Sequence, residues 1–448
     1  MTQFKKSIFE LAIPSIIENI LQIMLSTVDT YFVSVLGSIA ISAVGLNSLI
    51  SNLYLTFFIA ISTGVSILTA RADGENNNTK VNVTIQNGLL LTLILSILFF
   101  ILNLLFGRNL LALLGKDPLL IEEAYLYFAV VILPIFSLSF MTVLSGLIKA
   151  IGDTKSPMVT VFFINIINVI LDYILIIGIG GFSGIGIIGA GIATTVSRLI
   201  GCVILLVILN KKTDFISSFK FKFTNNIKEM IGYAIPVGLE KIIMRIGQLI
   251  YGSLIVSIGI AHYTGHNIAG TIEGFSYLPA MGFGVAAFTL IGHAIGEANY
   301  NDIQKIGLLT FKYSTIFMLF IGSIFFIFAP NLASIFTNDP EIIRLVSIVL
   351  RIIALFQPFL CSTQVIASSL QALGDVKYPL YLTGIGIWCI RILGTYVFGL
   401  KLGYGLIGVW ISYAIDVTFR GTMLWLRFIK KTKSVKLLRE EYINESSQ

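Results

Sequence analysis

The sequence predicts an all-α polytopic membrane protein with twelve transmembrane helices, arranged as two parallel six-helix repeats (6+6) around a central cleft. Three observations predict this fold class: the hydrophobic composition, the number of long apolar segments, and a repeat at one fixed offset. Hydrophobic residues make up 56% of the 448 residues and charged residues 12%, whereas ordinary soluble domains carry about 25% charged residues. The mean hydropathy is +0.92, so lipid is the solvent that suits this chain.

Twelve segments are long and apolar enough to cross a bilayer, which requires about 20 residues. Their apolar runs are continuous, which predicts helices rather than the alternating strands of a β-barrel. The predicted spans cover residues 11–35, 45–70, 85–107, 121–146, 157–180, 185–209, 229–256, 267–292, 306–330, 343–370, 378–399 and 405–427. Because no A-x-A-like cleavage site interrupts the first run, we expect a retained span rather than a signal peptide.

The distribution of positive charge predicts the orientation. Of the 30 Lys and Arg residues, 20 fall on one side of the predicted spans and 5 on the other. Cytoplasmic loops carry an excess of Lys and Arg, so we expect both termini in the cytoplasm and the chain in the cytoplasmic membrane. The remaining five basic residues lie within spans: Arg198, Lys241, Arg245, Arg391 and Arg420.

The chain repeats itself at an offset of 222 residues. Ala12-Ile13-Pro14 recurs as Ala234-Ile235-Pro236, and Gly152-Asp153 recurs as Gly374-Asp375. Each repeat holds an even number of predicted spans, so the two repeats lie parallel about an axis along the membrane normal. We expect an N-lobe at 1–210, a cytoplasmic linker at 211–228, a C-lobe at 229–427 and a basic cytoplasmic tail at 428–448. Two lobes that face a cleft suit a transporter that works by alternating access.

Acids within the spans are functional candidates, because insertion of an ionisable side chain costs at least a few kcal/mol. Glu18 and Asp29 are 11 residues apart in the first span, close to three helical turns, and so share a face. In the fifth span, Asn168 and Asp172 lie one turn apart. Carboxylate and amide oxygens suit a small cation, and a buried carboxyl group can instead carry a proton. These residues predict an ion-coupling site in the N-lobe.

The second lobe does not repeat these acids. At the 222 offset, Asp29 corresponds to Tyr251 and Asp172 to Gly394, which predicts coupling centred on the N-lobe. The polar residues of the C-lobe can be explained by structural pairing as an alternative to a functional role.

Glu18 recurs as Glu240 at the 222 offset. For both residues, pairing with another side chain in a structural role fits as well as a functional role. Lys241 and Arg245 could form a structural ion pair with Glu240 or with Glu273. Asp416 and Arg420 at i, i+4 predict a neutralising pair on the last span.

Several classes of protein are excluded by the motifs that the sequence lacks. Its three cysteines lie in apolar stretches and form neither a disulfide framework nor a CxxC metal site. There is no GxxxxGK[ST] motif for ATP and no HExxH motif. The net charge of +7 reflects the cytoplasmic loops rather than nucleic-acid binding. We therefore expect no catalytic residues, no cofactor, no nucleic acid and no ATPase subunit.

The residues resemble the multidrug and toxic compound extrusion (MATE) family. The resemblance rests on Pro14 with Val28-Asp29-Thr30 and Leu36-Gly37, on the loop Gly152 to Pro157 echoed at Gly374 to Pro379, and on Gly74-Glu75 echoed at Gly296-Glu297. It covers essentially the whole chain. It implies an antiporter that expels organic cations, commonly drugs and dyes, in exchange for protons or sodium.

The resemblance also implies a cation site made of a first-span Asp, an Asn and Asp one turn apart on the fifth span, and a sixth-span Thr. The matching positions are Asp29, Asn168, Asp172 and, of two neighbouring threonines, Thr194. A sodium ion could bind at the first three. The NorM branch also places acids on the seventh and tenth spans. Here the tenth span has none, although Glu240 stands on the seventh, so the pattern is closer to coupling through the N-lobe.

The sequence thus predicts a cation-coupled antiporter, driven by protons or sodium, that exports amphipathic organic cations. Glu18, Glu240 and Glu273 are its secondary polar or substrate sites. The alternative is a flippase for a lipid-linked precursor, which would show more basic residues along the cleft. A membrane-bound transferase would need loop acids or a histidine constellation, and neither is evident.

Overall fold

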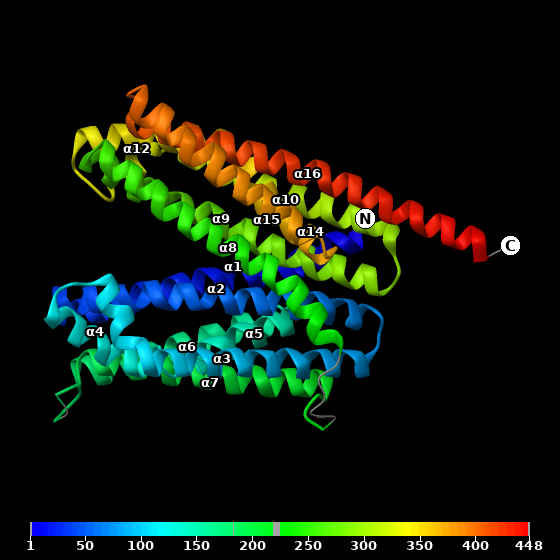
Figure 1. The fold of residues 1–448 in the computed structure, drawn as a ribbon, viewed down its shortest axis with the longest axis horizontal. Coiled ribbons are helices and arrows are strands. Elements are labelled where there is room, and N and C mark those ends of the chain that lie inside the picture. Colours follow the sequence, from blue (N-terminus) through cyan, green and yellow to red (C-terminus); the bar gives the residue numbers. More distant parts are fainter. Residues whose placement is uncertain (1, 182, 218–224, 447–448) are drawn as a thin grey trace. The chain divides into compact units, whose positions relative to one another are not determined.

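The computed structural model describes residues 2–181, 183–217 and 225–446, which form helices joined by short loops and contain no extended β-strand. The helices of the first half are α1 (Thr2–Ser34), α2 (Ser38–Gly74), α3 (Asn78–Leu114), α4 (Pro118–Val131), α5 (Phe136–Ala150), α6 (Lys155–Asp172), the π-helical turn η1 (Tyr173–Ile177) and α7 (Ile187–Thr213). Figure 1 shows most of them labelled.

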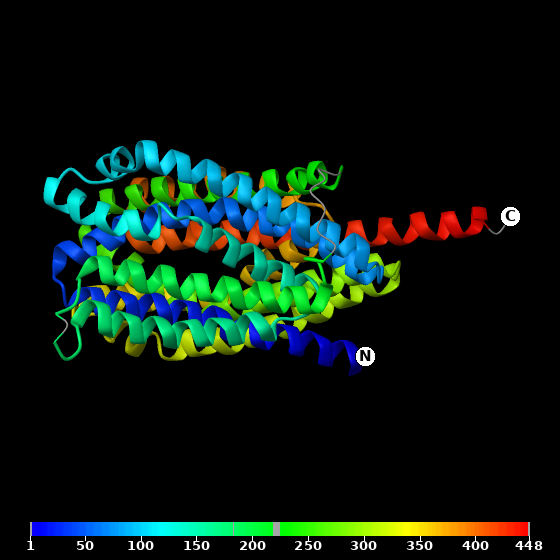
Figure 2. The same cartoon turned by 90° about the horizontal axis from the view of Figure 1, so that it is seen from below.

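The helices of the second half are α8 (Asn225–Ile258), α9 (Ile260–Gly296), α10 (Tyr300–Ile327), α11 (Ala329–Ser334), α12 (Pro340–Leu355), α13 (Gln357–Cys361), η2 (Ser362–Ile366), α14 (Ala367–Ala372), α15 (Lys377–Gly384), η3 (Ile385–Ile392), η4 (Thr395–Lys401) and α16 (Gly405–Ser446). The end of α16 projects beyond the other helices of its half in Figures 1 and 2.

Among the described residues, nine helices are long and apolar enough to cross a membrane. Two bent pairs raise the number to eleven: α4 with α5, bent by 50°, and α12 with the α13–α14 segment, bent by 66°. The twelfth predicted span, 405–427, forms the first half of α16, where Asp416 and Arg420 interrupt the apolar sequence. The predicted fold class, an all-α polytopic membrane protein, is confirmed.

The chain divides into two compact units whose boundaries lie within helices. The N-unit is Ile17–Gly238, and the C-unit is Met1–Ile16 together with Leu239–Gln448. Each boundary follows shortly after a proline inside a helix, Pro14 in α1 and Pro236 in α8. The first turns of α1 therefore belong to the C-unit, and the first turns of α8 belong to the N-unit.

Buried contacts hold these two helix segments in place. Phe9 in α1 packs edge-on against Phe283 of the C-unit, with ring centroids 5.8 Å apart. In the N-unit, α8 approaches α2 so closely that a Cβ on Gly64 would lie 2.5 Å from the carbonyl oxygen of Met230. Only glycine permits this approach of two backbones.

The N-unit is organised around α2, which packs against α3, α4 and α5, while α7 packs along α6 and also contacts α4 and α5. Its core includes Phe58, Val65 and Leu144, all completely buried. In the C-unit, α9 packs against α10 and α12, and α16 packs against η3 and η4. Trp410, Phe283 and Phe428 are among the largest fully buried side chains of the C-unit. Burial of such side chains is the main stabilising contribution to each unit.

The start of α6 is fixed by Asp153 in the loop that precedes it. Its Oδ1 accepts hydrogen bonds from the backbone N–H groups of Lys155 and Ser156, both at 3.0 Å, and Lys212 Nζ lies 3.1 Å from its Oδ2. Burial acts to raise the pKa of Asp153, but the hydrogen bonds from Ser156 and the charge of Lys212 outweigh it and hold the pKa below its ordinary value. The ionised Asp153 thus anchors the helix that carries Asn168 and Asp172 to the end of α7.

Candidate functional site

The structure brings Asp29, Asn168 and Asp172 together in the N-unit. Asp29 comes from α1, and the other two residues lie one turn apart on α6, where each is only 1% exposed. In the amide orientation that satisfies both of its atoms, the Asn168 nitrogen donates to Asp29 Oδ1 at 2.7 Å and to Asp172 Oδ2 at 3.1 Å. Asn168 therefore bridges the two acids.

The two carboxyl groups accept from the same amide nitrogen and therefore lie close to each other. Two negative charges this close together in an apolar setting repel each other, so the pair favours uptake of a cation. The arrangement can hold a single shared proton or another small cation.

Thr194 of α7 borders this cluster. Its hydroxyl donates to the carbonyl oxygen of Ala190 at 3.0 Å, and its side chain lies near Tyr127. The neighbouring Thr195 turns toward α4 instead and donates to the carbonyl oxygen of Val130 at 2.8 Å. The structure thus distinguishes the two threonines, with Thr194 on the side of the acids.

Tyr127 of α4 was missed in the sequence. It is 8% exposed and lies close enough to Asp29 and Asp172 for their charges to act on it. A single tyrosine in an apolar span has no periodic partner on its own helix, so its position beside the acids follows only from the packing of α4 against α7.

The backbone changes character directly after Asp172. Here α6 continues as the π-helical turn η1, and π-helical turns occur frequently at functional sites. Gly189 of α7 packs on this turn, since a Cβ at position 189 would lie 2.4 Å from the carbonyl oxygen of Leu175. A glycine in α7 therefore sets how closely the segment after Asp172 approaches the helix that carries Thr194.

We expect Gly189→Ala to reduce transport by about tenfold or more, because the added methyl group pushes η1, and with it Asp172, away from the cluster. Transport of an organic cation by reconstituted protein is the measurement. Gly181→Ala is the matched control, because a Cβ at position 181 meets nothing within 4 Å. Equal transport rates for the two variants would contradict this role of Gly189.

Glu18 lies apart from the cluster in an ion pair. Its Oε1 accepts hydrogen bonds from Lys149 Nζ at 2.8 Å and from Ser145 Oγ at 3.2 Å, and Glu18 is 1% exposed. Lys149 is in the last turn of α5. Further along α1, Asn165 Nδ2 donates to the carbonyl oxygen of Leu21 at 2.8 Å. Both contacts attach α1 to the N-unit.

Glu240 has a different environment from its repeat partner Glu18. Its Oε1 accepts a hydrogen bond from Thr383 at 3.0 Å, while its buried Oε2 has no partner among the described residues. The ion pair expected of Lys241 or Arg245 with Glu240 or Glu273 is absent from the described part of the chain. Arg245 instead donates to Gln248 Oε1 at 3.5 Å, because the two residues follow one another along the exposed face of α8.

A second charged cluster lies in the C-unit. Asp416 is completely buried and binds two guanidinium groups: Arg391 Nη2 at 2.6 Å from Oδ2 and Arg420 Nε at 2.7 Å from Oδ1. The predicted pair of Asp416 with Arg420 is thereby confirmed, and Arg391 from η3 is an additional partner.

Glu273 lies beside this cluster. It is 6% exposed, and its Oε1 has no hydrogen-bond partner among the described residues. The hydroxyl groups of Tyr413 and Tyr277 bond to each other. The guanidinium of Arg391 stacks over the Tyr413 ring at 4.2 Å. Glu273 is thus a buried acid of the C-unit that forms no ion pair among the described residues.

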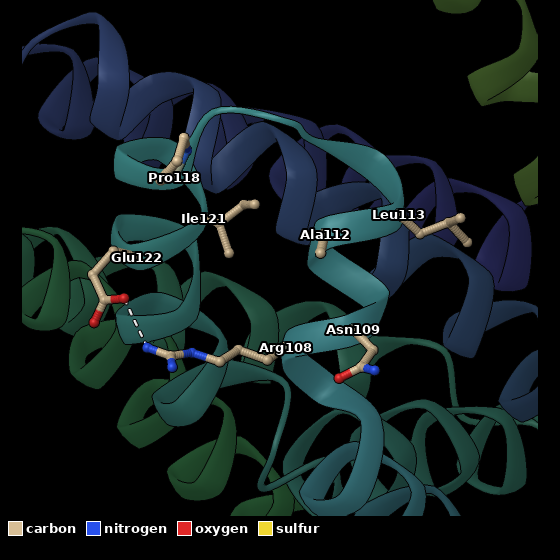
Figure 3. A pocket seen from close by; sticks show the side chains of 7 residues that line it. All are labelled: Arg108, Asn109, Ala112, Leu113, Pro118, Ile121 and Glu122. Atoms are coloured by element: carbon tan, nitrogen blue, oxygen red, sulfur yellow. Dashed lines mark hydrogen bonds and ion pairs between the residues drawn. The ribbon is translucent and has the colours of Figure 1, made fainter.

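An open pocket lies elsewhere in the N-unit, between the end of α3 and the start of α4 (Figure 3). Arg108 and Glu122 form an ion pair of 2.7 Å across it, and both side chains are more than half exposed. Asn109, Ala112, Leu113, Pro118 and Ile121 complete the lining. None of the candidate site residues reaches this pocket, so it does not contain the acidic cluster.

A family model named MatE matches this chain twice, at residues 14–174 and 236–397. The chain belongs to the MatE family. The two matches begin 222 residues apart, which is the offset of the internal repeat. This MatE chain is therefore an integral membrane transporter built from two copies of one helical unit.

Relatives and solved structures agree with the MatE assignment. "Probable multidrug resistance protein NorM" of Thermotoga maritima is 30% identical over 443 residues, which cover 98% of this chain and 95% of the relative. "Uncharacterized transporter YisQ" of Bacillus subtilis is 26% identical over 429 residues, 94% and 93% of the two chains. The fold matches that of "a multidrug resistance MATE family transporter of the MOP superfamily" with a TM-score of 0.88 over 97% of each chain and 24% identity.

Proposed function

We propose that this MatE protein is an antiporter that exports amphipathic organic cations by alternating access, in exchange for a small cation bound at Asp29, Asn168 and Asp172, with Thr194 at the border of the site. One observation carries the proposal: an amide bridges two acids, the buried Asp172 and the partly buried Asp29, on helices that are long and apolar enough to cross a membrane. Acids at such positions are costly and are typical of ion pathways. The relatives named as multidrug resistance proteins support the class of substrate.

We further propose that the coupling cation is a proton. Sodium binds best where several oxygen atoms converge. Here Asn168 presents its nitrogen to both acids, so its oxygen is turned away from them. Two carboxyl groups bonded to one amide nitrogen repel each other when both are ionised, and a shared proton removes that repulsion. A sodium ion at the same three residues is the alternative, and it would require rotation of the Asn168 amide.

Exchange follows from competition for the same negative charge. When both acids are ionised, the cluster attracts an organic cation, and protonation removes that attraction and releases the substrate. With both termini in the cytoplasm of the cell, as the loop charges predict, protons entering through the cytoplasmic membrane would drive export.

The test is ethidium transport by the full chain in proteoliposomes with imposed gradients. We expect ethidium flux to follow a proton gradient, to be unaffected by an equal sodium gradient, and to stop when a protonophore collapses the proton gradient. Ethidium flux that follows only the sodium gradient would identify sodium, rather than the proton, as the coupling ion. Flux under neither gradient would contradict antiport and favour the flippase, which translocation of a fluorescent lipid analogue in the same vesicles would detect.

A further inference from the structure

The open pocket between α3 and α4 lies where two predicted spans end. Arg108 directly follows the span predicted at 85–107, and Glu122 lies at the start of the span predicted at 121–146. Residues at such positions lie at the level of the lipid headgroups, because headgroup layers flank a hydrocarbon core about 30 Å thick. The pocket has a volume of about 670 Å³, which is within the range of small-molecule sites, about 300–1,000 Å³.

The two charged side chains of the pocket are accessible and have hydrogen-bonding capacity to spare. Arg108 Nη2 lies 2.7 Å from Glu122 Oε2, and the side chains are 59% and 62% exposed; Figure 3 shows them pointing toward one another. Within the described part of the chain, neither the other N–H groups of Arg108 nor Glu122 Oε1 forms a hydrogen bond. The guanidinium also lies over the Tyr125 ring at 5.1 Å, which restricts its orientation. A zwitterion can therefore bind both groups without separating them.

The internal repeat separates this ion pair from the needs of the fold. The start of α4 at Pro118 recurs as the start of α12 at Pro340, each preceded by an aspartate that caps the helix. The charged residues do not recur at the 222 offset, where Arg108 corresponds to Pro330 and Glu122 to Arg344. The C-unit thus forms the same helix start without the pair, and an exposed ion pair adds little stability. This favours a ligand as the reason for the two opposite charges.

We propose that this pocket binds the headgroup of phosphatidylethanolamine, with the lipid phosphate at Arg108 and the primary ammonium at Glu122. Both contacts are charge-assisted hydrogen bonds, which are stronger than neutral ones. Phosphatidylglycerol has the same phosphate but carries no ammonium group, so it can form only the contact with Arg108. The pocket therefore prefers phosphatidylethanolamine.

The surface beside the pocket favours a lipid over a soluble zwitterion. Leu113 lines the pocket and is 83% exposed. Leu105 and Phe106, within one turn before Arg108 on α3, are 64% and 51% exposed. Exposed apolar side chains that lie together in this way are typical of membrane contact. A lipid whose headgroup enters the pocket can place its acyl chains on this surface of α3.

The test is native mass spectrometry of the purified full chain titrated with dioleoylphosphatidylethanolamine or dioleoylphosphatidylglycerol. We expect wild type to bind the ethanolamine lipid about tenfold more tightly, which corresponds to one hydrogen bond to a charged group. Glu122→Gln should remove this preference, and Arg108→Gln should weaken the binding of both lipids. Arg344→Gln and Glu341→Gln remove exposed charges from the first turns of α12, and these matched controls should leave both affinities unchanged.

Equal affinities of wild type for the two lipids would overturn the proposal, as would an unchanged preference in folded Glu122→Gln protein. Glycerophosphoethanolamine, which is the headgroup without acyl chains, separates a lipid from a soluble ligand. We expect it not to displace the lipid at equal concentration. If it does, the ligand is a soluble zwitterion and the assignment to a lipid is wrong. Neither measurement involves transport, so a failure here leaves the proposed antiport untouched.

Discussion

Asp29→Asn and Asp172→Asn each abolish gradient-driven export of ethidium, with an expected fall of about 100-fold in the coupled rate. An amide resembles a protonated carboxyl group in shape but cannot gain or lose a proton. Either variant therefore holds one of the two acids that Asn168 bridges in a state that resembles the protonated form. Initial rates of ethidium flux in proteoliposomes with an imposed proton gradient provide the measurement.

Asn165→Ala is the control for these two variants. Asn165 lies on α6 as well, but its side chain donates to the backbone of α1 at Leu21 rather than to the acids. We expect this variant to lose a little stability, about 1 kcal/mol for one hydrogen bond, and to keep its response to the gradient. A response to the gradient that survives in both aspartate variants would remove the cluster from the coupling mechanism.

Asp416→Ala produces the largest loss of stability. Arg391 and Arg420 both depend on this carboxylate and are nearly buried, with side chains 10% and 12% exposed. Removal of one partner from a buried ion pair costs about 3–5 kcal/mol, because the remaining charge is left uncompensated. We expect a markedly lower melting temperature in detergent and a smaller fraction of monodisperse protein.

Two comparisons test the reason for that loss. Glu122→Ala removes an acid from an ion pair of similar length, 2.7 Å, but with both side chains more than half exposed, and should cost less than about 1 kcal/mol. Combining Asp416→Ala with Arg391→Met and Arg420→Met should recover part of the stability, since no buried charge remains. If the triple variant is no more stable than Asp416→Ala, uncompensated charge is not the cause.

The sequence predicted those features that depend on composition or on one helix at a time. The apolar segments gave the spans, and the 222 offset gave the repeat that the two family matches reproduce. The spacing of Asn168 and Asp172 placed both on one face of α6, and that face does meet Asp29.

The missed features depend on which helices become neighbours. Tyr127 and Arg391 lie on helices whose own sequences give no sign of the partner they meet. Lys149 lies in the last turn of α5, and its long side chain reaches back along that helix to Glu18. Periodicity defines the face of a helix, but only tertiary packing defines what lies opposite.

The boundaries of the two units within α1 and α8 give the molecule the character of a swapped dimer joined into one chain. Each repeat contributes the beginning of its first helix to the packed core of the other unit, as two subunits do when they exchange a terminal element. A gene cut between α7 and α8 would therefore not yield two self-sufficient halves. Each half would carry a segment that belongs in the other's core, and each would lack the segment that completes its own.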